Sequence, residues 1–188
     1  MAWIKTIGYK DATGYLKELY IRVMGSHSTI DNVVTMHSLR PHTLDAHLSL
    51  YQATLHHKDN SLSRWLLEGI GTWVSSLNKC EYCFTHHSRG LKRELKDDIK
   101  FEQLIAAILK ADFSNTFLSE KEKSAFLYAK DLTEFPPKST SADIQKMREE
   151  GFSDEEILEI NQVTSYFSYV NRTVIGLGCS LEKTDENE

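Results

Sequence analysis

Apolar residues recur at intervals of three and four along most of this chain. Two clear stripes are Leu104, Ile105, Ile108 and Leu109, and Ile157, Leu158, Ile160 and Val163. This spacing places apolar side chains on one face of a helix, where they pack into a core. The 188 residues include only nine glycines and three prolines, and no long β-branched alternation bounded by turns. The sequence therefore predicts an all-α protein.

The apolar periods and their flanking residues set the expected helix boundaries. We predict helices over residues 11–24, 31–39, 42–57, 62–77, 81–97, 99–110, 120–132, 141–149, 154–170 and 171–179. Capping pairs, in which an acidic side chain follows a hydroxyl side chain by three residues, mark three starts. They are Ser119 with Glu122, Thr140 with Asp143, and Ser153 with Glu156. We expect Asp11 to cap a first helix ending near Gly25, and Gly151 to end the 141–149 helix.

Composition and charge narrow the class of protein. We expect a single helical domain over residues 1–181, with the break at 135–141 as an internal loop, and an acidic tail over 182–188. The net charge of −5 gives no general attraction to nucleic acid or to an anionic membrane. No apolar run approaches the roughly 20 residues of a membrane span, and the first residues lack a signal-peptide pattern. We therefore expect a cytoplasmic protein that binds neither nucleic acid nor membrane.

The chemical features concentrate in residues 80–87, CEYCFTHH, which hold two of the three cysteines. In a helix, Cys80 and Cys83 are three residues apart and Cys83 and His87 four apart, so all three share one face. In a reducing cytosol, a close cysteine pair is more often catalytic, redox-active or metal-binding than a structural disulfide. The motif therefore indicates either a dithiol redox centre or part of a metal site.

A carboxylate on the preceding helix should lie close to this motif. Because the connection near residue 79 is so short, the two helices should be antiparallel neighbours, and Glu68 should lie at the level of His87. Glu68 is set in an apolar stretch, which indicates burial with a polar partner, although an ion pair with Arg64 is the simpler alternative. Ser75, seven residues after Glu68, shares its face and should lie nearer the level of Cys83.

These residues can activate a thiol. The thiolate is the reactive form of cysteine, and an isolated thiol with a pKa of about 8.5 is mostly protonated at neutral pH. The N-terminus of a helix should lower the pKa of Cys80 and Cys83, and His87 can accept the Cys83 proton while Glu68 orients the imidazole. Once Cys83 is oxidised to sulfenic acid, Cys80 can resolve it as a disulfide.

A zinc site is the main alternative for the same side chains. Thiolates and imidazole are good zinc ligands, and C-x-x-C is a common half-site. The chain has no second C-x-x-C, so the fourth ligand would have to be His86 or a distant histidine. His56 and His57 form the tightest such pair, which we interpret as surface residues. A helical protein that is structural or only interacts with partners also remains open.

The motif resembles that of the AhpD-like alkylhydroperoxidases, within the carboxymuconolactone decarboxylase superfamily. The matching residues are Glu68, Ser75, Cys80, Cys83 and His87. Within this superfamily, the chain is most similar to the peroxidase-related branch. The likeness lies in the tyrosine of C-x-Tyr-C, the paired histidines at 86–87 and the stretch 166–178. The motif that carries this resemblance covers roughly residues 64–90.

The resemblance implies an all-α fold that assembles as trimers or hexamers, without a metal or other cofactor. It implies that Cys83 attacks a peroxide substrate, that Cys80 resolves, that His87 and Glu68 relay protons, and that an external thiol restores the dithiol. One departure is Tyr82, where AhpD carries a histidine. Tyrosine, with an ordinary pKa of about 10, does not easily shuttle protons at neutral pH. Non-redox chemistry like that of the decarboxylases is the alternative activity, and paired thiols argue against it.

Overall fold

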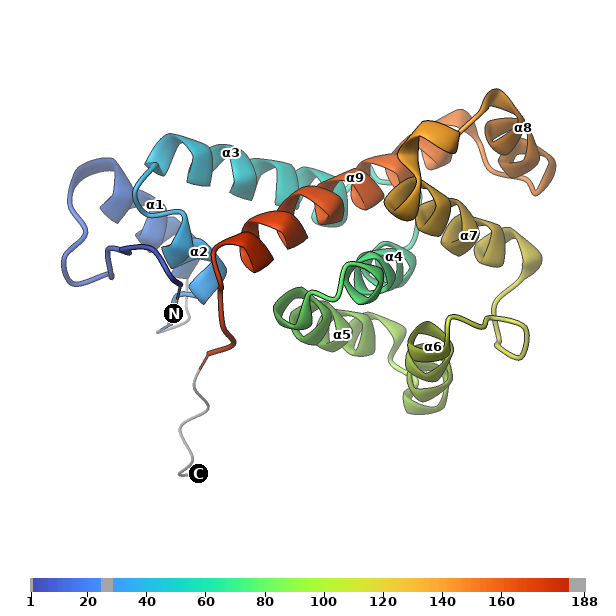
Figure 1. Ribbon diagram of the computed structural model, residues 1–188, viewed down its shortest axis with the longest axis horizontal. Helices are drawn as coiled ribbons and strands as arrows, with labels where there is room; N and C mark the ends of the chain where they lie inside the picture. Colours follow the sequence, from blue (N-terminus) through green and yellow to red (C-terminus); the bar gives the residue numbers. More distant parts are fainter. Residues whose placement is uncertain (1, 25–28, 183–188) are drawn as a thin grey trace. The chain divides into compact units, whose positions relative to one another are not determined.

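The computed structural model describes residues 2–24 and 29–182, and these residues form helices without any strand (Figure 1). The expected all-α class is therefore confirmed. The helices are α1 (Gly14–Met24), α2 (Asn32–Met36), α3 (Pro41–Tyr51), the π-helical turn η1 (Gln52–His56), α4 (Arg64–Leu77), α5 (Glu81–Leu95), α6 (Asp98–Lys110), α7 (Glu120–Glu134), the 3₁₀ turn η2 (Pro136–Lys138), α8 (Ser141–Glu149) and α9 (Asp154–Gly176).

The chain divides into two compact units. The first comprises Met1–Tyr51 and Arg172–Glu188, and the second comprises Gln52–Asn171. In the second unit, α4 packs against α5 and α7, and α5 also packs against α6 (Figure 1). The buried residues of α4 include Leu67, Ile70 and Trp73, so α4 is the central helix of this unit.

The connection between α4 and α5 is as short as the sequence predicts. Lys79 takes a left-handed backbone conformation with φ of 56°. Its N–H donates to the carbonyl of Ser76, and the N–H of Cys80 donates to the carbonyl of Ser75 at 2.9 Å. This is the hydrogen-bond pattern of a Schellman motif, which satisfies the last carbonyls of a helix. The motif turns the chain at once, so that α5 begins at Glu81 directly beside α4.

The predicted capping pairs are confirmed. Ser119 and Glu122 form a reciprocal capping box at the start of α7. Ser153 and Glu156 make the equivalent exchange at the start of α9, with donor–acceptor distances of 2.9 and 3.2 Å. The Asp143 carboxylate accepts the Thr140 backbone N–H at 2.7 Å.

At the end of α8, Gly151 has a φ of 91°, which is the left-handed conformation that this position favours. The Phe152 N–H donates to the carbonyl of Met147, and the Gly151 N–H to that of Arg148. The predicted end of this helix is therefore confirmed.

Two boundary predictions are wrong. Asp11 does not cap the first helix, because it lies in a turn with its N–H on the carbonyl of Gly8, and α1 begins three residues later at Gly14. The chain from 154 forms one helix through Asn171 to Gly176, because no glycine or proline interrupts it there. It ends where Gly178 adopts a φ of 62°.

Two further predictions concern residues whose structure is not described. The predicted end near Gly25 lies outside the described residues, as does the tail from 183. The first residue of the predicted acidic tail, Glu182, is described. Its carboxylate accepts the backbone N–H of Asn32 at 2.8 Å.

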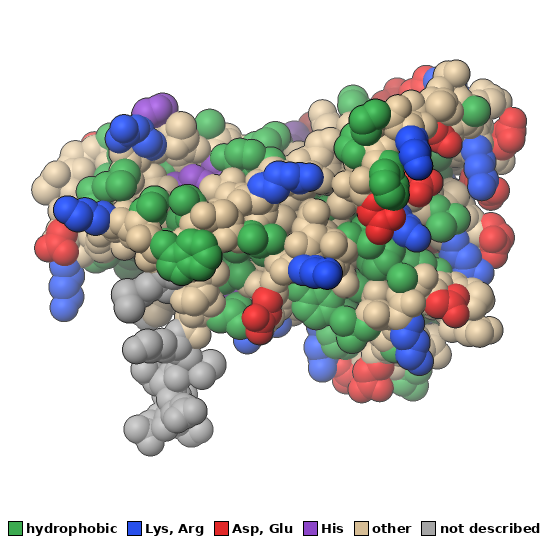
Figure 2. All heavy atoms as spheres, in the orientation of Figure 1, with side chains coloured by type: hydrophobic (Ala, Val, Ile, Leu, Met, Phe, Trp, Pro, Cys, Tyr) green, Lys and Arg blue, Asp and Glu red, His purple; other side chains and the backbone are tan. Residues whose placement is uncertain are grey.

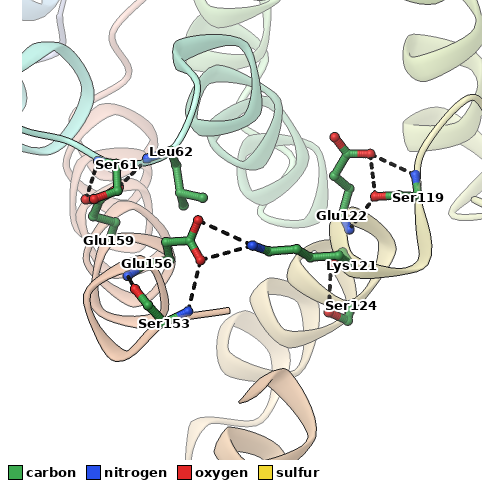
Figure 3. A network of polar contacts seen from close by, with 9 residues as sticks. All are labelled: Ser61, Leu62, Ser119, Lys121, Glu122, Ser124, Ser153, Glu156 and Glu159. Atoms are coloured by element: carbon green, nitrogen blue, oxygen red, sulfur yellow. Dashed lines mark hydrogen bonds and ion pairs between the residues drawn. The ribbon is translucent and has the colours of Figure 1, made fainter. Parts of the chain in front are cut away.

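Carboxylates on α9 fasten it to the rest of the second unit. Both oxygens of Glu159 accept backbone N–H groups of the loop before α4, from Ser61 at 2.7 Å and from Leu62 at 2.9 Å (Figure 3). Glu156 pairs with Lys121 of α7 at 3.0 Å. These contacts hold α9 against the loop before α4 and against α7. The later turns of α9 contribute side chains to the site described below.

A buried histidine in the first unit, His47, makes the free energy of unfolding depend on pH. The rings of His37 and His47 stack with centroids 4.7 Å apart. Burial, and then the neighbouring His37, lower the pKa of His47 to about 4. The ordinary pKa is about 6.5, so the unfolded chain binds a proton first as the pH falls. The stabilising contribution is therefore complete above about pH 6.5 and lost as the pH falls towards about 4.

We expect the free energy of unfolding to fall by about 2 kcal/mol between about pH 7 and about pH 5 through His47 alone. His47→Gln, which cannot titrate, should show correspondingly less pH dependence. Urea unfolding of both proteins at the two pH values measures the difference. Equal pH dependence in the two proteins would contradict this assignment.

The visible surface carries charges of both signs. On the face shown in Figure 2, Lys and Arg side chains are mixed with Asp and Glu side chains. Among the described residues, no helix combines the length and the apolar character needed to cross a membrane.

Candidate functional site

The two thiols of the motif lie at the start of α5. Cys80 occupies the N-cap position in an extended conformation, one residue before the helix, and Cys83 lies in the first turn. Neither is in a disulfide, and both residues are buried, with exposed fractions of 1% and 4%. The prediction that both sulfurs lie at a helix N-terminus therefore agrees with the structure, although Cys80 precedes the helix.

Hydrogen bonding stabilises the thiolate form of Cys80. The Cys83 thiol, which donates to the Cys80 sulfur, has the largest effect and lowers the pKa of Cys80. The Cys83 backbone N–H and the Asn171 amide lower this pKa further, whereas burial of the sulfur opposes them. A hydrogen bond to the charged form of a group favours that form. These hydrogen bonds therefore favour the charged form of the Cys80 sulfur.

Glu68 and His87 form a hydrogen-bonded pair between α4 and α5, in which the carboxylate is buried and the imidazole partly buried. The imidazole Nδ1 lies 2.8 Å from the Glu68 carboxylate, so Nδ1–H donates to the carboxylate oxygen. Glu68 is 2% exposed. The predicted proximity of these two residues is confirmed. The alternative partner, Arg64, instead directs its guanidinium to the backbone carbonyl of His56.

Glycines provide the space for this pair. A Cβ atom at Gly90 of α5 would lie 2.8 Å from the Glu68 carboxyl carbon and from both of its oxygens. A Cβ atom at Gly71 of α4 would lie 2.3 Å from the ring of Phe167. That ring comes from α9 and meets the His87 imidazole edge to face, with centroids 4.5 Å apart. The two glycines thus let carboxylate, imidazole and phenyl ring pack together without space for a further methyl group.

Ser75 and two asparagines form a polar network beside Cys80. Ser75 and Asn171 are both fully buried. The Asn171 amide nitrogen donates to Ser75 Oγ at 3.1 Å, and Ser75 Oγ donates to the Gly71 carbonyl at 2.8 Å. Asn78, at the end of α4, donates to Asn171 Oδ1 at 3.0 Å. Ser75 therefore belongs to a buried hydrogen-bond network, and α9 supplies its side-chain partner.

Aromatic and imidazole groups border the site. The buried Tyr82 ring stacks on His86, with centroids 4.4 Å apart. The prediction that His56 is a surface residue is wrong: it is half-buried at the end of η1. Burial lowers its pKa, while the nearby Glu68 carboxylate raises it, and Arg64, His87 and Arg93 lower it. His56 therefore shares the electrostatic environment of the Glu68–His87 pair.

Comparisons with solved structures agree with this architecture. The fold matches an uncharacterised peroxidase-related protein from Ralstonia eutropha JMP134 described as an alkylhydroperoxidase AhpD core, with a TM-score of 0.83 and 20% identity over 97% of this chain and 93% of the other. A second peroxidase-related protein, from Silicibacter sp. TM1040, has a TM-score of 0.82 and 21% identity over 96% and 92%. This chain has the AhpD-like fold.

The debrominase Bmp8 also has a similar structure. A cysteine-to-alanine variant of Bmp8, in complex with 2,3,4-tribromopyrrole, matches with a TM-score of 0.75 and 18% identity over 95% of this chain and 91% of the other. No protein-family model matches the sequence. No curated protein matches it either. Proteins with this fold are thus described with more than one activity. The fold alone does not specify the reaction, so the function has to be inferred from the site residues.

Within the described parts of this AhpD-like chain, no three His, Cys, Asp or Glu side chains gather in a way that could hold a metal ion. The third cysteine, Cys179, is buried in the first unit and is not in a disulfide.

Sequence reasoning missed the contributions of Gly71, Gly90 and Phe167 to the site, and did not assign Asn171 to it. The glycines carried a signal, because glycine inside a helical pattern is unfavourable and commonly has a packing reason.

Proposed function

We propose that this protein reduces hydroperoxides through a thiol–disulfide cycle at Cys80 and Cys83. The observation that carries the proposal is the arrangement of two buried, hydrogen-bonded thiols at the start of a helix that also bears a carboxylate-paired histidine. Nucleophile, base and orienting carboxylate are the three elements of an activated nucleophile. The AhpD-like fold supports the same interpretation.

The oxidation step uses the base on α5. His87 takes the Cys83 proton, and Glu68 stabilises the imidazolium that results. The Cys83 thiolate attacks the terminal oxygen of the hydroperoxide, so that an S–O bond forms and the O–O bond breaks. The electron pair leaves on an alkoxide, which takes the proton from His87 and departs as an alcohol. Cys83 is then a sulfenic acid, oxidised by two electrons.

The resolving step forms a disulfide. The Cys80 thiolate attacks the Cys83 sulfur, an S–S bond forms, and hydroxide leaves and is protonated to water. An external dithiol then reduces the disulfide by thiol–disulfide exchange and is itself oxidised. Ser75 supports this step through its bond to the network beside Cys80, and Tyr82 closes the site next to the dithiol. This cycle needs no metal or other cofactor, and we propose that it operates in a cytoplasmic trimer or hexamer of this chain.

Reductive debromination is the second candidate, because the debrominase Bmp8 shares the fold. That reaction also needs two electrons, which the Cys80–Cys83 dithiol can supply by closing to a disulfide. Of the two thiol protons, one replaces the bromine on carbon and the other is released with bromide. A parallel assay with a bromopyrrole separates the two substrates, since the proposed function predicts faster oxidation of the dithiol by a hydroperoxide.

The Glu68 carboxylate provides a direct test of the proton relay. We expect Glu68→Gln to lower kcat/KM for an organic hydroperoxide by about a hundredfold, because the neutral amide does not stabilise the imidazolium. The measurement is hydroperoxide consumption with excess dithiothreitol. Glu159→Gln is the matched control, since that carboxylate holds only the loop before α4. Similar losses in both variants, or none in Glu68→Gln, would refute the relay.

A further inference from the structure

The His87 imidazole has two different neighbours that together define its orientation. Its Nδ1–H donates to the Glu68 carboxylate of α4 at 2.8 Å. The second neighbour comes from α9, where the Phe167 ring lies at 86° to the imidazole plane with the two centroids 4.5 Å apart. Edge-to-face packing at this distance is a preferred geometry for planar rings. Rotation of the imidazole about its Cβ–Cγ bond would break the hydrogen bond and disturb the ring contact, so the two contacts fix its plane.

The Phe167 ring is itself held in place. It is fully buried, and a Cβ atom at Gly71 would lie 2.3 Å from its Cε2 and Cζ atoms. The far end of the ring therefore lies against the backbone of α4 at Gly71. This glycine follows Glu68 by three residues, so both lie on one face of the helix. A ring packed between a helix backbone and a second ring has little space to shift.

We propose that Phe167 is a positioning residue, which fixes the His87 imidazole so that Nδ1 stays on Glu68 and Nε2 serves as the proton-accepting nitrogen. The inference rests on the proposed function, because the proton concerned is the one that His87 takes from Cys83. Since Nδ1–H is engaged by Glu68, this proton binds at Nε2 and later passes to the alkoxide. A small displacement of a reacting group is costly in rate, so an imidazole free to rotate would be a poorer base.

Phe167 also shields the contact between His87 and Glu68 from water. The Glu68 side chain is 3% exposed and the His87 side chain is 15% exposed. A hydrogen bond away from water is electrostatically stronger than one in water. A smaller side chain at position 167 would leave a space beside the imidazole. The ring therefore supports the pair both by its shape and by its volume.

Phe167→Leu is the variant that tests this role, because it keeps a buried apolar side chain and removes the planar ring. We expect kcat/KM for an organic hydroperoxide to fall by at least about tenfold. Proton NMR gives a second readout that needs no turnover. The His87 Nδ1 proton should give a downfield resonance in the wild type, which Glu68→Gln abolishes and which identifies it. In Phe167→Leu this resonance should broaden through exchange with water.

The double variant Gly71→Ala/Phe167→Leu separates positioning from packing. Leucine is shorter than phenylalanine, so the new methyl group at position 71 occupies part of the space that the ring leaves. We expect the double variant to unfold at a higher urea concentration than Phe167→Leu, while its turnover and its resonance stay as in Phe167→Leu. Recovery of turnover and resonance together with stability would show that Phe167 acts only by filling space.

Phe126→Leu is the matched control, since Phe126 is an equally buried phenylalanine of the same unit whose ring meets Phe113 with centroids 4.8 Å apart. It should unfold more easily but keep the turnover and the resonance of the wild type. If Phe167→Leu does not fold, Phe167→Met fills more of the volume and also lacks a ring. An unchanged resonance and full turnover in a folded Phe167 variant would overturn the proposal, as would a wild type without the resonance. A wild type that shows the resonance but ignores hydroperoxide would refute the proposed function alone, because the resonance still tests how Phe167 holds His87.

Discussion

Replacing Gly90 with alanine is expected to lower hydroperoxide turnover by about a hundredfold and the free energy of unfolding by about 1–3 kcal/mol. The new Cβ atom would lie 2.8 Å from the carboxylate of Glu68, well inside contact distance. Alanine is the better helix former by about 1 kcal/mol, so the loss would arise from packing and not from helix propensity. Since Glu68 is buried between the two helices, its carboxylate would have to leave His87.

Gly69→Ala provides the matched control for this variant. Gly69 lies on α4, next to Glu68 in sequence, and a Cβ atom there would lie 3.2 Å from the Phe126 ring. The substitution adds the same methyl group on the side of α4 that faces Phe126 and leaves the Glu68 carboxylate in place. Steady-state kinetics should show near wild-type turnover. Urea unfolding should report only the effect of the closer packing against Phe126 on the free energy of unfolding. A Gly90→Ala protein with full turnover would show that the Glu68–His87 contact is dispensable.

Serine substitutions of the two thiols should give different defects. Cys83→Ser removes the attacking sulfur, so hydroperoxide consumption should fall by at least about a thousandfold. Cys80→Ser leaves that sulfur in place. It should consume about one equivalent of hydroperoxide and then stop, with a sulfenic acid on Cys83 that dimedone labels.

Cys179→Ser is the control for these variants, because this buried thiol lies in the first unit. It should retain the activity of the wild type. Mass spectrometry of the dimedone-treated proteins identifies the modified residue. Dimedone on Cys80 in the Cys83→Ser protein, together with continued turnover, would reverse the roles assigned to the two sulfurs.

The contact between Glu68 and His87 could be predicted because it depends on local features. The helical period fixes which side chains share a face, and a connection too short to separate two helices fixes their antiparallel pairing. The cysteine pair and its position at a helix start follow from the same spacing. These features need no knowledge of how distant segments pack.

The contribution of α9 could not be predicted in this way. Nothing in the spacing of residues specifies which face of a helix 96 residues away meets Ser75, as Asn171 does. We also predicted a helix boundary at Asn171, where the structure has a continuous helix. Asparagine is favoured at helix N-caps over helix interiors, but the buried hydrogen bonds of Asn171 with Asn78 and Ser75 outweigh that preference here.

The turn at Lys79 is a second feature that could not be predicted from the sequence. A left-handed residue after the end of a helix is most often glycine, yet the residue at this position after α4 is Lys79, with a φ of 56°. The sequence therefore lacks the usual signal for the Schellman motif that places the Cys80 N–H on Ser75. The short connection was predictable, whereas its hydrogen-bond pattern was not.

Free-thiol counting tests the central claim most directly. The reduced wild-type protein should be titrated before and after one equivalent of an organic hydroperoxide, with metal content measured on the same samples. We predict the loss of two thiols per chain, a Cys80–Cys83 disulfide in the peptide map, and an unmodified Cys179. An unchanged thiol count would contradict thiol peroxidase chemistry at this site. Bound zinc in those samples would then favour a metal site formed by the same cysteines.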